Sequence, residues 1–186
     1  MNEEYWNNYY TRYTEPFEPS SFSRFALQYM NKAEKLIDLG CGNCRDSVFF
    51  SKNDINVIAI DKSESTQAIC ADVTKLRNIN TTHSYARFLL HCLTDEEEND
   101  LLRWVKRNTK KYLFIETRSD AGNRLPSTHY RRYINMNKLL SKLIYFNFKI
   151  KYCKESNGLS IYDSKFGADE NKQDIDPILI RVVAQA

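Results

Sequence analysis

Two glycines and one aspartate indicate the chemistry that this sequence could perform. Gly40 and Gly42 follow an apolar run and precede a helix-like segment, RDSVFFSK, so the chain turns sharply between a buried strand and a helix. Glycine is needed where the backbone adopts positive φ or passes close to a ligand, and the next helix presents free N–H groups. Asp61 ends a second apolar run about 20 positions further on, where a carboxylate can hydrogen-bond ribose hydroxyls. The pattern predicts a site for a nucleoside derivative.

Two nucleotide-binding motifs are absent from the sequence, and their absence limits which nucleoside derivative the site could bind. The dinucleotide pattern G-x-G-x-x-G needs a third glycine where this chain has Arg45, and no G-x-x-x-x-G-K-[ST] occurs. Asp38 lies just before the first glycine, where a carboxylate would repel a pyrophosphate and suit a ligand with cationic groups. S-adenosylmethionine has a sulfonium and an α-amino group, and it is the predicted cofactor.

Seven stretches resemble the class I S-adenosylmethionine-dependent methyltransferases. They are DLGCGNCRDSVFF, AIDKS, CADV, YARFLLH, LFIETRSD, HYRRYI and DPILIRVVA. The resemblance implies that Asp38, Gly40 and Gly42 face the methionine half of the cofactor, Asp61 the ribose and Asp72 the adenine, with Arg45 shaping the site. Asp72 could equally cap a helix before VTKL, and both roles can coexist. The later stretches resemble a subgroup found near glycan-building enzymes, which implies association with such enzymes.

Three histidines are candidates for the base that removes a proton from an acceptor. His91 follows the apolar run ARFLL at the expected carboxyl end of a strand, where open α/β sheets keep their sites, and it is the leading candidate. His129 is the second, because in the resembling subgroup such a piece borders the acceptor pocket. His83 precedes the same strand and is expected at the surface.

Charged residues near the ends of later strands are candidates for acceptor binding. Glu116 and Arg118 could bind acceptor hydroxyls or orient a histidine, although a solvated ion pair is the commoner fate of neighbouring opposite charges. The basic cluster of Arg118, Arg124, Arg131 and Arg132 could grip a phosphate or a nucleotide sugar, and Tyr130 lies within it. The same cluster could equally be a solvated loop.

Cys41 and Cys44 form a C-x-x-C motif within the glycine turn. Taken alone, this motif suggests a redox pair or half of a zinc site. The remaining cysteines are isolated and no paired histidines occur, so a tetrahedral site would lack two ligands and no metal is predicted.

Strands and helices that alternate along the chain predict the fold. We expect strands at residues 35–38, 56–60, 68–71, 84–89, 112–116, 148–156 and 178–184. We expect helices from Ser20 or Ser21 to about residue 31, and at 44–52, 95–108 and 136–145, with polar loops at 117–134 and 157–176. The fold class is α/β: a Rossmann-like, doubly wound, mostly parallel seven-stranded sheet with an antiparallel edge strand, in a single domain.

The N-terminal segment is dense in aromatic residues. Residues 1–19 contain Tyr5, Trp6, Tyr9, Tyr10, Tyr13 and Phe17. They could cover exposed core, or form a cover over the ligand site that excludes water. The domain over residues 1–186 would then consist of a covering segment, 1–31, and a catalytic core, 32–186.

Bulk properties exclude several classes of protein. The excess of 27 Lys and Arg over 24 Asp and Glu gives a net charge of only +3, which does not favour nucleic acid or an acidic membrane surface. There is no membrane-length apolar run and no signal sequence at the polar N-terminus. Five cysteines, an odd number, fit a reduced compartment, so we expect a cytoplasmic protein.

Three functions fit these features. The first is an O-methyltransferase for a small-molecule hydroxyl, most simply on a sugar, nucleotide sugar or glycan. The second is a methyltransferase for another small acceptor, such as a thiol, an amine or a metalloid oxyanion. The third is an inactive cofactor-binding subunit of a larger assembly. A nucleic-acid amino-methyltransferase is disfavoured because no N-P-P-Y or D-P-P-Y occurs.

Overall fold

A seven-stranded sheet in the order β3-β2-β1-β4-β5-β7-β6 forms the centre of the protein. The computed structural model describes residues 3–12, 18–122, 129–157 and 178–186. The strands are β1 (Lys35–Leu39), β2 (Asn56–Asp61), β3 (Ile69–Cys70), β4 (Thr81–Arg87), β5 (Thr109–Arg118), β6 (Lys149–Ser156) and β7 (Leu179–Gln185). β1 to β5 pair in parallel, whereas β7 runs antiparallel between β5 and β6. The predicted fold class is confirmed, and the antiparallel strand lies one position in from the edge strand β6.

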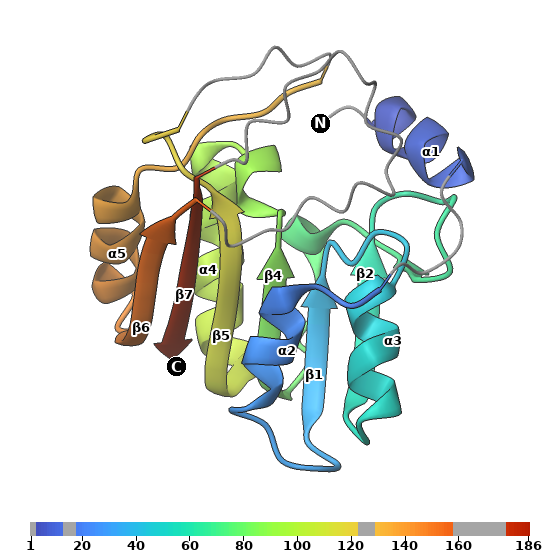
Figure 1. Cartoon of the computed structure of the whole chain (residues 1–186), viewed down its shortest axis with the longest axis horizontal. Helices are drawn as coiled ribbons and strands as arrows, with labels where there is room; N and C mark the ends of the chain where they lie inside the picture. Colours follow the sequence, from blue (N-terminus) through green and yellow to red (C-terminus); the bar gives the residue numbers. More distant parts are fainter. Residues whose placement is uncertain (1–2, 13–17, 123–128, 158–177) are drawn as a thin grey trace.

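Helices cover both faces of this sheet (Figure 1). They are α1 (Glu3–Arg12), α2 (Ser21–Leu27), α3 (Arg45–Lys52), α4 (Asp95–Asn108) and α5 (Met136–Tyr145), with short 3-10 turns η1 (Val73–Lys75) and η2 (Leu90–Cys92). Successive residues of a strand point to opposite faces, so Leu36 packs with Phe22 of α2 and Phe50 of α3, while Ile37 belongs to the cluster that includes residues of α4 and α5. The doubly wound arrangement follows from strands that are apolar on both faces.

Helix ends follow local capping signals. Thr94 and Glu97 form a capping box at α4, and α4 and α5 have the predicted bounds. The Ser20 side chain accepts from the Ser23 N–H and begins α2, which ends near Gln28 and is shorter than expected.

One prediction about a histidine is wrong. β4 begins at Thr81, so His83 lies inside the strand and is fully buried instead of at the surface. Its Nε2 lies 2.8 Å from Glu34 Oε2. The sequence missed this pairing because Glu34 is 49 positions away.

The carboxyl ends of the parallel strands meet at one edge of the sheet, and α1 lies beyond that edge (Figure 1). Of the aromatic N-terminal segment and the two polar loops predicted from the sequence, residues 1–2, 13–17, 123–128 and 158–176 lie outside the described residues. None of the helices in the described ranges has the length and apolar character needed to span a membrane.

Candidate active site

A cavity of ≈ 700 Å³ lies at the carboxyl ends of β1, β2, β4 and β5. Most of the predicted site residues line it: Asp38, Gly40, Gly42, Arg45, Asp61, Asp72, His91, Glu116, Arg118 and Arg131. His129 and Tyr130 are not among the described lining residues. Tyr5, Trp6, Tyr9 and Tyr10 of α1 also line the cavity, so the aromatic segment contributes a wall to it. The size suits a small molecule beside a nucleoside derivative.

The loop after β1 requires its glycines. Gly40 and Gly42 have φ values of 70° and 56°, which favour glycine. A Cβ on Gly40 would lie 3.0 Å from the Leu89 side chain, and one on Gly42 would lie 2.8 Å from Cζ of Tyr10. The absence of side chains on these glycines makes room for the Leu89 and Tyr10 side chains that pack against the loop.

Asp38 is a buried carboxyl group at the end of β1, only 2% exposed. Ser47 donates a hydrogen bond to its Oδ2 at 2.6 Å. Burial raises the pKa of Asp38 to about 8, and the neighbouring carboxylates Asp46 and Asp61 add to the rise. A cationic ligand group beside Asp38 would reverse this effect, and the role predicted for this residue stays a prediction.

Asp61 connects the glycine loop to the loop after β2. It accepts backbone hydrogen bonds from Gly42 at 2.8 Å and Ser63 at 2.9 Å, and burial raises its pKa. Asp72 caps η1 by accepting from the Thr74 N–H at 2.9 Å and pairs with Lys62 at 3.4 Å. The capping alternative for Asp72 is thus present, and its carboxylate also lines the cavity.

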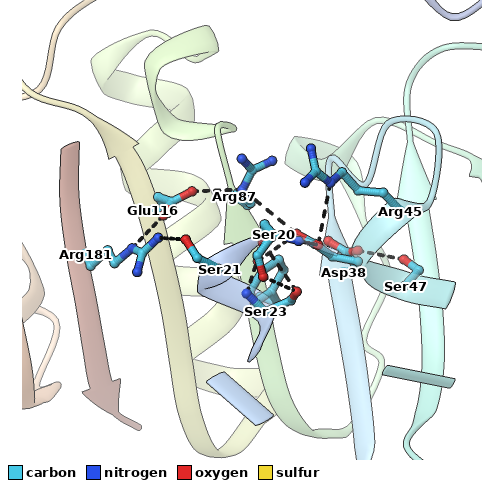
Figure 2. A network of polar contacts seen from close by, with 11 residues as sticks. Ser20, Ser21, Ser23, Asp38, Arg45, Ser47, Arg87, Glu116 and Arg181 are labelled. Carbon is cyan, nitrogen blue, oxygen red and sulfur yellow. Dashed lines mark hydrogen bonds and ion pairs between the residues drawn. The ribbon is translucent and has the colours of Figure 1, made fainter. Parts of the chain in front are cut away.

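A network of buried charges connects residues that line the cavity with Arg181 of β7 (Figure 2). Glu116 Oε1 accepts from Arg87 Nε at 2.8 Å, and Glu116 Oε2 accepts from Arg181 Nε at 2.6 Å. Both carboxylate oxygens of Glu116 are therefore bound to arginine from neighbouring strands. The role predicted for Glu116, acceptor binding, stays a prediction.

Asp46 is the second anion of this network. Burial would raise its pKa, but the charge of Arg87 and hydrogen bonds from Ser20 hold it below the usual value. Tyr85 also donates to its Oδ2 at 2.9 Å. Arg45 reaches Asp46 Oδ1 at 3.8 Å, and its buried Nε has no hydrogen-bond partner among the described residues.

Sequence reasoning missed Asp46, Tyr85, Arg87 and Arg181. A signal existed for two of them. Asp46 lies in the first turn of a helix, where a carboxylate is favoured, and Arg181 interrupts an otherwise apolar strand, ILIRVVA.

Cationic groups gather at the ends of β4 and β5. The guanidinium groups of Arg87 and Arg118 lie 4.4 and 5.6 Å from the Phe88 ring centroid. Phe88 has φ of 53°, an uncommon conformation for a bulky residue that can mark a functional site. His91 is 3% exposed, with Nδ1 3.4 Å from Thr117 Oγ1, and burial followed by the charges of Arg118 and Arg131 holds its pKa well below the usual value.

The rest of the predicted basic cluster separates into different environments. Arg131 lies 3.1 Å from His129 Nε2, and His129 stacks on Tyr5 of α1 with ring centroids 4.0 Å apart. Arg132 instead pairs with Glu98 and Asp95 of α4. Tyr130 is 47% exposed, and Arg124 lies outside the described residues.

α1 is held over the cavity by polar contacts. Asn7 Oδ1 accepts from Ser63 Oγ at 2.7 Å and from the Glu64 N–H at 3.1 Å. The Tyr10 hydroxyl is buried, and burial together with the charge of Asp61 raises its pKa well above the usual value. The helix thus bridges the Asp61 side of the cavity to His129.

No group of three or more metal-ligating side chains occurs within the ranges that the structure describes.

Comparisons with known proteins agree with this geometry. A family model described as "Tellurite resistance protein TehB" matches residues 3–105, more than half of the chain. No curated protein matches the chain.

Solved structures share the fold at low identity. TehB from Haemophilus influenzae is 19% identical with a TM-score of 0.71, and the match covers 88% of this chain and 60% of that one. 1,6-Didemethyltoxoflavin-N1-methyltransferase from Burkholderia thailandensis, crystallised with S-adenosylhomocysteine, is 13% identical with a TM-score of 0.69 and coverages of 88% and 76%. The [4+2]-cyclase SpnF is 15% identical with a TM-score of 0.69 and coverages of 88% and 78%.

These matches confirm the methyltransferase-type fold, and the S-adenosylhomocysteine in one of them agrees with the predicted cofactor. They give no support to a subgroup associated with glycan biosynthesis. Because a cyclase shares the fold, the reaction has to be argued from the site.

Proposed function

The chain belongs to the TehB family of tellurite resistance proteins, and on this basis we propose that it is an S-adenosylmethionine-dependent methyltransferase for a small acceptor. The observation that carries the proposal is the cavity, which combines buried carboxylates at its β1 and β2 end with guanidinium groups at its β4 and β5 end. The chain spans about 60% of the length of the solved Haemophilus protein, so activity and substrate are inferred here from the site.

The cofactor is proposed to lie along the glycine loop. Asp38 would face the cationic methionine half, whose positive charge would lower the pKa that burial raises. Asp61 would accept hydrogen bonds from the ribose, and Asp72 from the adenine. Gly40 and Gly42 hold the loop in the positive-φ turn along which the cofactor would lie.

The acceptor is proposed to be a small anion. Arg118 and Arg131 line the cavity, and their charges together disfavour a proton on His91. Clustered guanidinium groups are suited to oxyanions and carboxylates, which they can bind in a bidentate manner. Tellurite, which the family name mentions, is an oxyanion. We therefore favour a metalloid oxyanion over a sugar or glycan hydroxyl as the acceptor.

Methyl transfer from a sulfonium is an in-line displacement, so the protein mainly has to position the acceptor and exclude water. The aromatic side chains of α1 would exclude water from the side of the cavity that this helix lines. Burial and the arginine charges keep His91 neutral and oppose its protonation, so it would act as the base only when a bound anionic acceptor offsets those charges, and His129 is the second candidate. The substrate-binding roles of Glu116 and Tyr130 remain predictions.

The test combines binding with turnover. Calorimetric titration should show micromolar binding of S-adenosylmethionine and S-adenosylhomocysteine, about −8 kcal/mol, and none of NAD. Formation of S-adenosylhomocysteine should then be measured with tellurite, selenite, a thiol, an amine and a nucleotide sugar. Arg118→Gln and Arg131→Gln should raise KM for the oxyanions, whereas Arg103→Gln, an exposed residue paired with Asp100, should not.

Two outcomes would redirect the proposal. Turnover with the nucleotide sugar alone would restore the predicted glycan-related acceptor and an association with glycan-synthesis enzymes. Cofactor binding without turnover on any acceptor would favour an inactive subunit. We also propose a cytoplasmic location, because all five cysteines are free thiols.

A further inference from the structure

The C-x-x-C motif brings two thiols together inside the glycine loop. Cys41 Sγ and Cys44 Sγ lie 3.8 Å apart and can share a hydrogen bond. Each sulfur also lies 3.8 Å from the carbonyl oxygen of Gly42. The transfer reaction proposed above uses neither thiol.

The two thiols differ in exposure and in acidity. Cys44 is the N-cap of α3 and is 7% exposed, and hydrogen bonding from Cys41 lowers its pKa. The N-terminus of a helix also favours a thiolate. Cys41 is half-buried and lines the cavity, so a small reagent can reach it. The same hydrogen bond, together with burial, raises the pKa of Cys41, so the thiolate of the pair is at Cys44 and the reachable thiol, Cys41, lies beside it with its proton.

Cys92 provides a contrast. It also lines the cavity, but burial raises its pKa to about 11, which keeps it a thiol. The hydrogen bond with Cys44 and burial raise the pKa of Cys41 as well, so Cys41 differs from Cys92 in having a second, more acidic thiol within reach and not in its own acidity.

We propose that Cys41 and Cys44 are a reversible thiol-modification site that low-molecular-weight disulfides oxidise, and that the resulting disulfide weakens cofactor binding. In the first step Cys41 attacks one sulfur of the reagent while its proton passes to the Cys44 thiolate along their hydrogen bond, and one thiolate of the reagent is released. In the second step Cys44 gives its proton to that leaving thiolate and attacks the mixed disulfide, releasing the second thiolate, which takes a proton from solvent. Two protein thiols are oxidised by two electrons, and the reagent is reduced to two thiols.

The link to the cofactor comes from Gly42, which lies between the two cysteines. A disulfide requires the sulfurs to approach from 3.8 Å to about 2.05 Å. Gly42 donates its N–H to Asp61 at 2.8 Å, so a change in this loop alters the placement of the proposed ribose ligand. This second half of the inference rests on the proposed function, and the first half does not.

The experiment uses the full chain with the exposed Cys70 and Cys153 replaced by serine, which prevents bonds between molecules. The protein is equilibrated in glutathione buffers of increasing oxidised fraction and analysed by peptide mass spectrometry and S-adenosylmethionine titration. We expect a bond between Cys41 and Cys44, a fall in cofactor affinity of tenfold or more, and recovery after dithiothreitol. Cys41→Ser should abolish the response, whereas Cys92→Ser should keep it.

Absence of a Cys41–Cys44 bond in oxidised glutathione would overturn the proposal, as would a bond that leaves cofactor affinity unchanged. If the reduced protein bound no S-adenosylmethionine, the proposed function would fail, and the mass measurement would still decide whether the dithiol forms its bond.

Discussion

The carboxylate of Asp61 accepts a hydrogen bond from the backbone N–H of Gly42 at 2.8 Å, which joins the glycine loop to the end of β2. Its other oxygen accepts from the Ser63 N–H at 2.9 Å. The carboxylate thus fixes two loops while it lines the cavity, so it can present a preformed acceptor to ribose hydroxyls.

Asp61→Asn should weaken S-adenosylmethionine binding by roughly 10- to 100-fold, because a hydrogen bond to a charged group contributes about 1.5–3 kcal/mol. Calorimetric titration measures this change. Asp100→Asn is the matched control, since the exposed pair with Arg103 lies outside the cavity. Unchanged affinity in Asp61→Asn would remove this residue from the ribose role.

Asp38 should make cofactor binding depend on pH. With a pKa of about 8 the group is mostly protonated at pH 7, and a bound cation would displace the proton. Affinity should therefore rise between pH 6 and 7.5, approaching tenfold per unit. Titration at pH 7 in buffers of different ionisation enthalpy should detect a released proton, and Asp38→Asn should release none.

In the free protein the same group acts on stability with the opposite trend. The folded state keeps the Asp38 proton up to about pH 8, whereas the unfolded state loses it near pH 3.8. The contribution of Asp38 to the free energy of unfolding is therefore largest below pH 3.8 and is lost as the pH rises toward 8. A stability profile of Asp38→Asn that matches the native profile would contradict the raised pKa.

The glycine loop was predictable because its chemistry lies in consecutive residues. Gly40 and Gly42 follow β1, and Asp61 is the last residue of β2; the apolar character of both strands is local, and α4 has its own capping box. His83 was misplaced because its partner, Glu34, comes from a distant segment. The buried pair of Arg181 and Glu116, 65 positions apart, likewise depends on β7 lying beside β5. Long-range pairing between strands leaves no local signal in the sequence.

Asn7 should control how firmly α1 covers the cavity. Its Oδ1 accepts from Ser63 Oγ and the Glu64 N–H, so Asn7→Ala should leave two donors without this partner and free the helix. Amide hydrogen exchange over residues 3–12 should accelerate roughly 5- to 10-fold, which corresponds to about 1 kcal/mol. Asn8→Ala, at an exposed neighbouring position, should leave exchange unaltered. Equal exchange in both variants would show that these contacts do not hold α1.

Glu116 should prove essential for stability. Its side chain is 1% exposed and pairs with Arg87 and Arg181. Glu116→Gln removes the carboxylate that pairs with both arginines and leaves Arg87 with Asp46 at 3.9 Å, and breaking such a buried pair costs about 3–5 kcal/mol. Urea denaturation should show this loss. A stable Glu116→Gln protein with impaired acceptor binding would instead favour the role predicted from the sequence.

His91 should act on turnover and not on cofactor binding. Its surroundings hold the imidazole neutral at pH 7, since burial and the charges of Arg118 and Arg131 lower its pKa well below the usual value. A base of this kind should keep kcat/KM constant down to pH 6.5, with a decline only at lower pH. His91→Asn should lower kcat by 10²- to 10⁴-fold, the usual range for acid–base catalysis, and leave S-adenosylmethionine affinity unchanged.

The stability of the same variant provides an independent readout. Below pH 6.5 the unfolded state gains a proton on His91 that the folded state does not take, so the native protein should lose stability as the pH falls. This part of the acid sensitivity should disappear in His91→Asn.

His129→Asn, which alters a ring stacked on Tyr5, should change KM more than kcat. An undiminished rate in His91→Asn, together with a large loss of kcat in His129→Asn, would transfer the base role to His129.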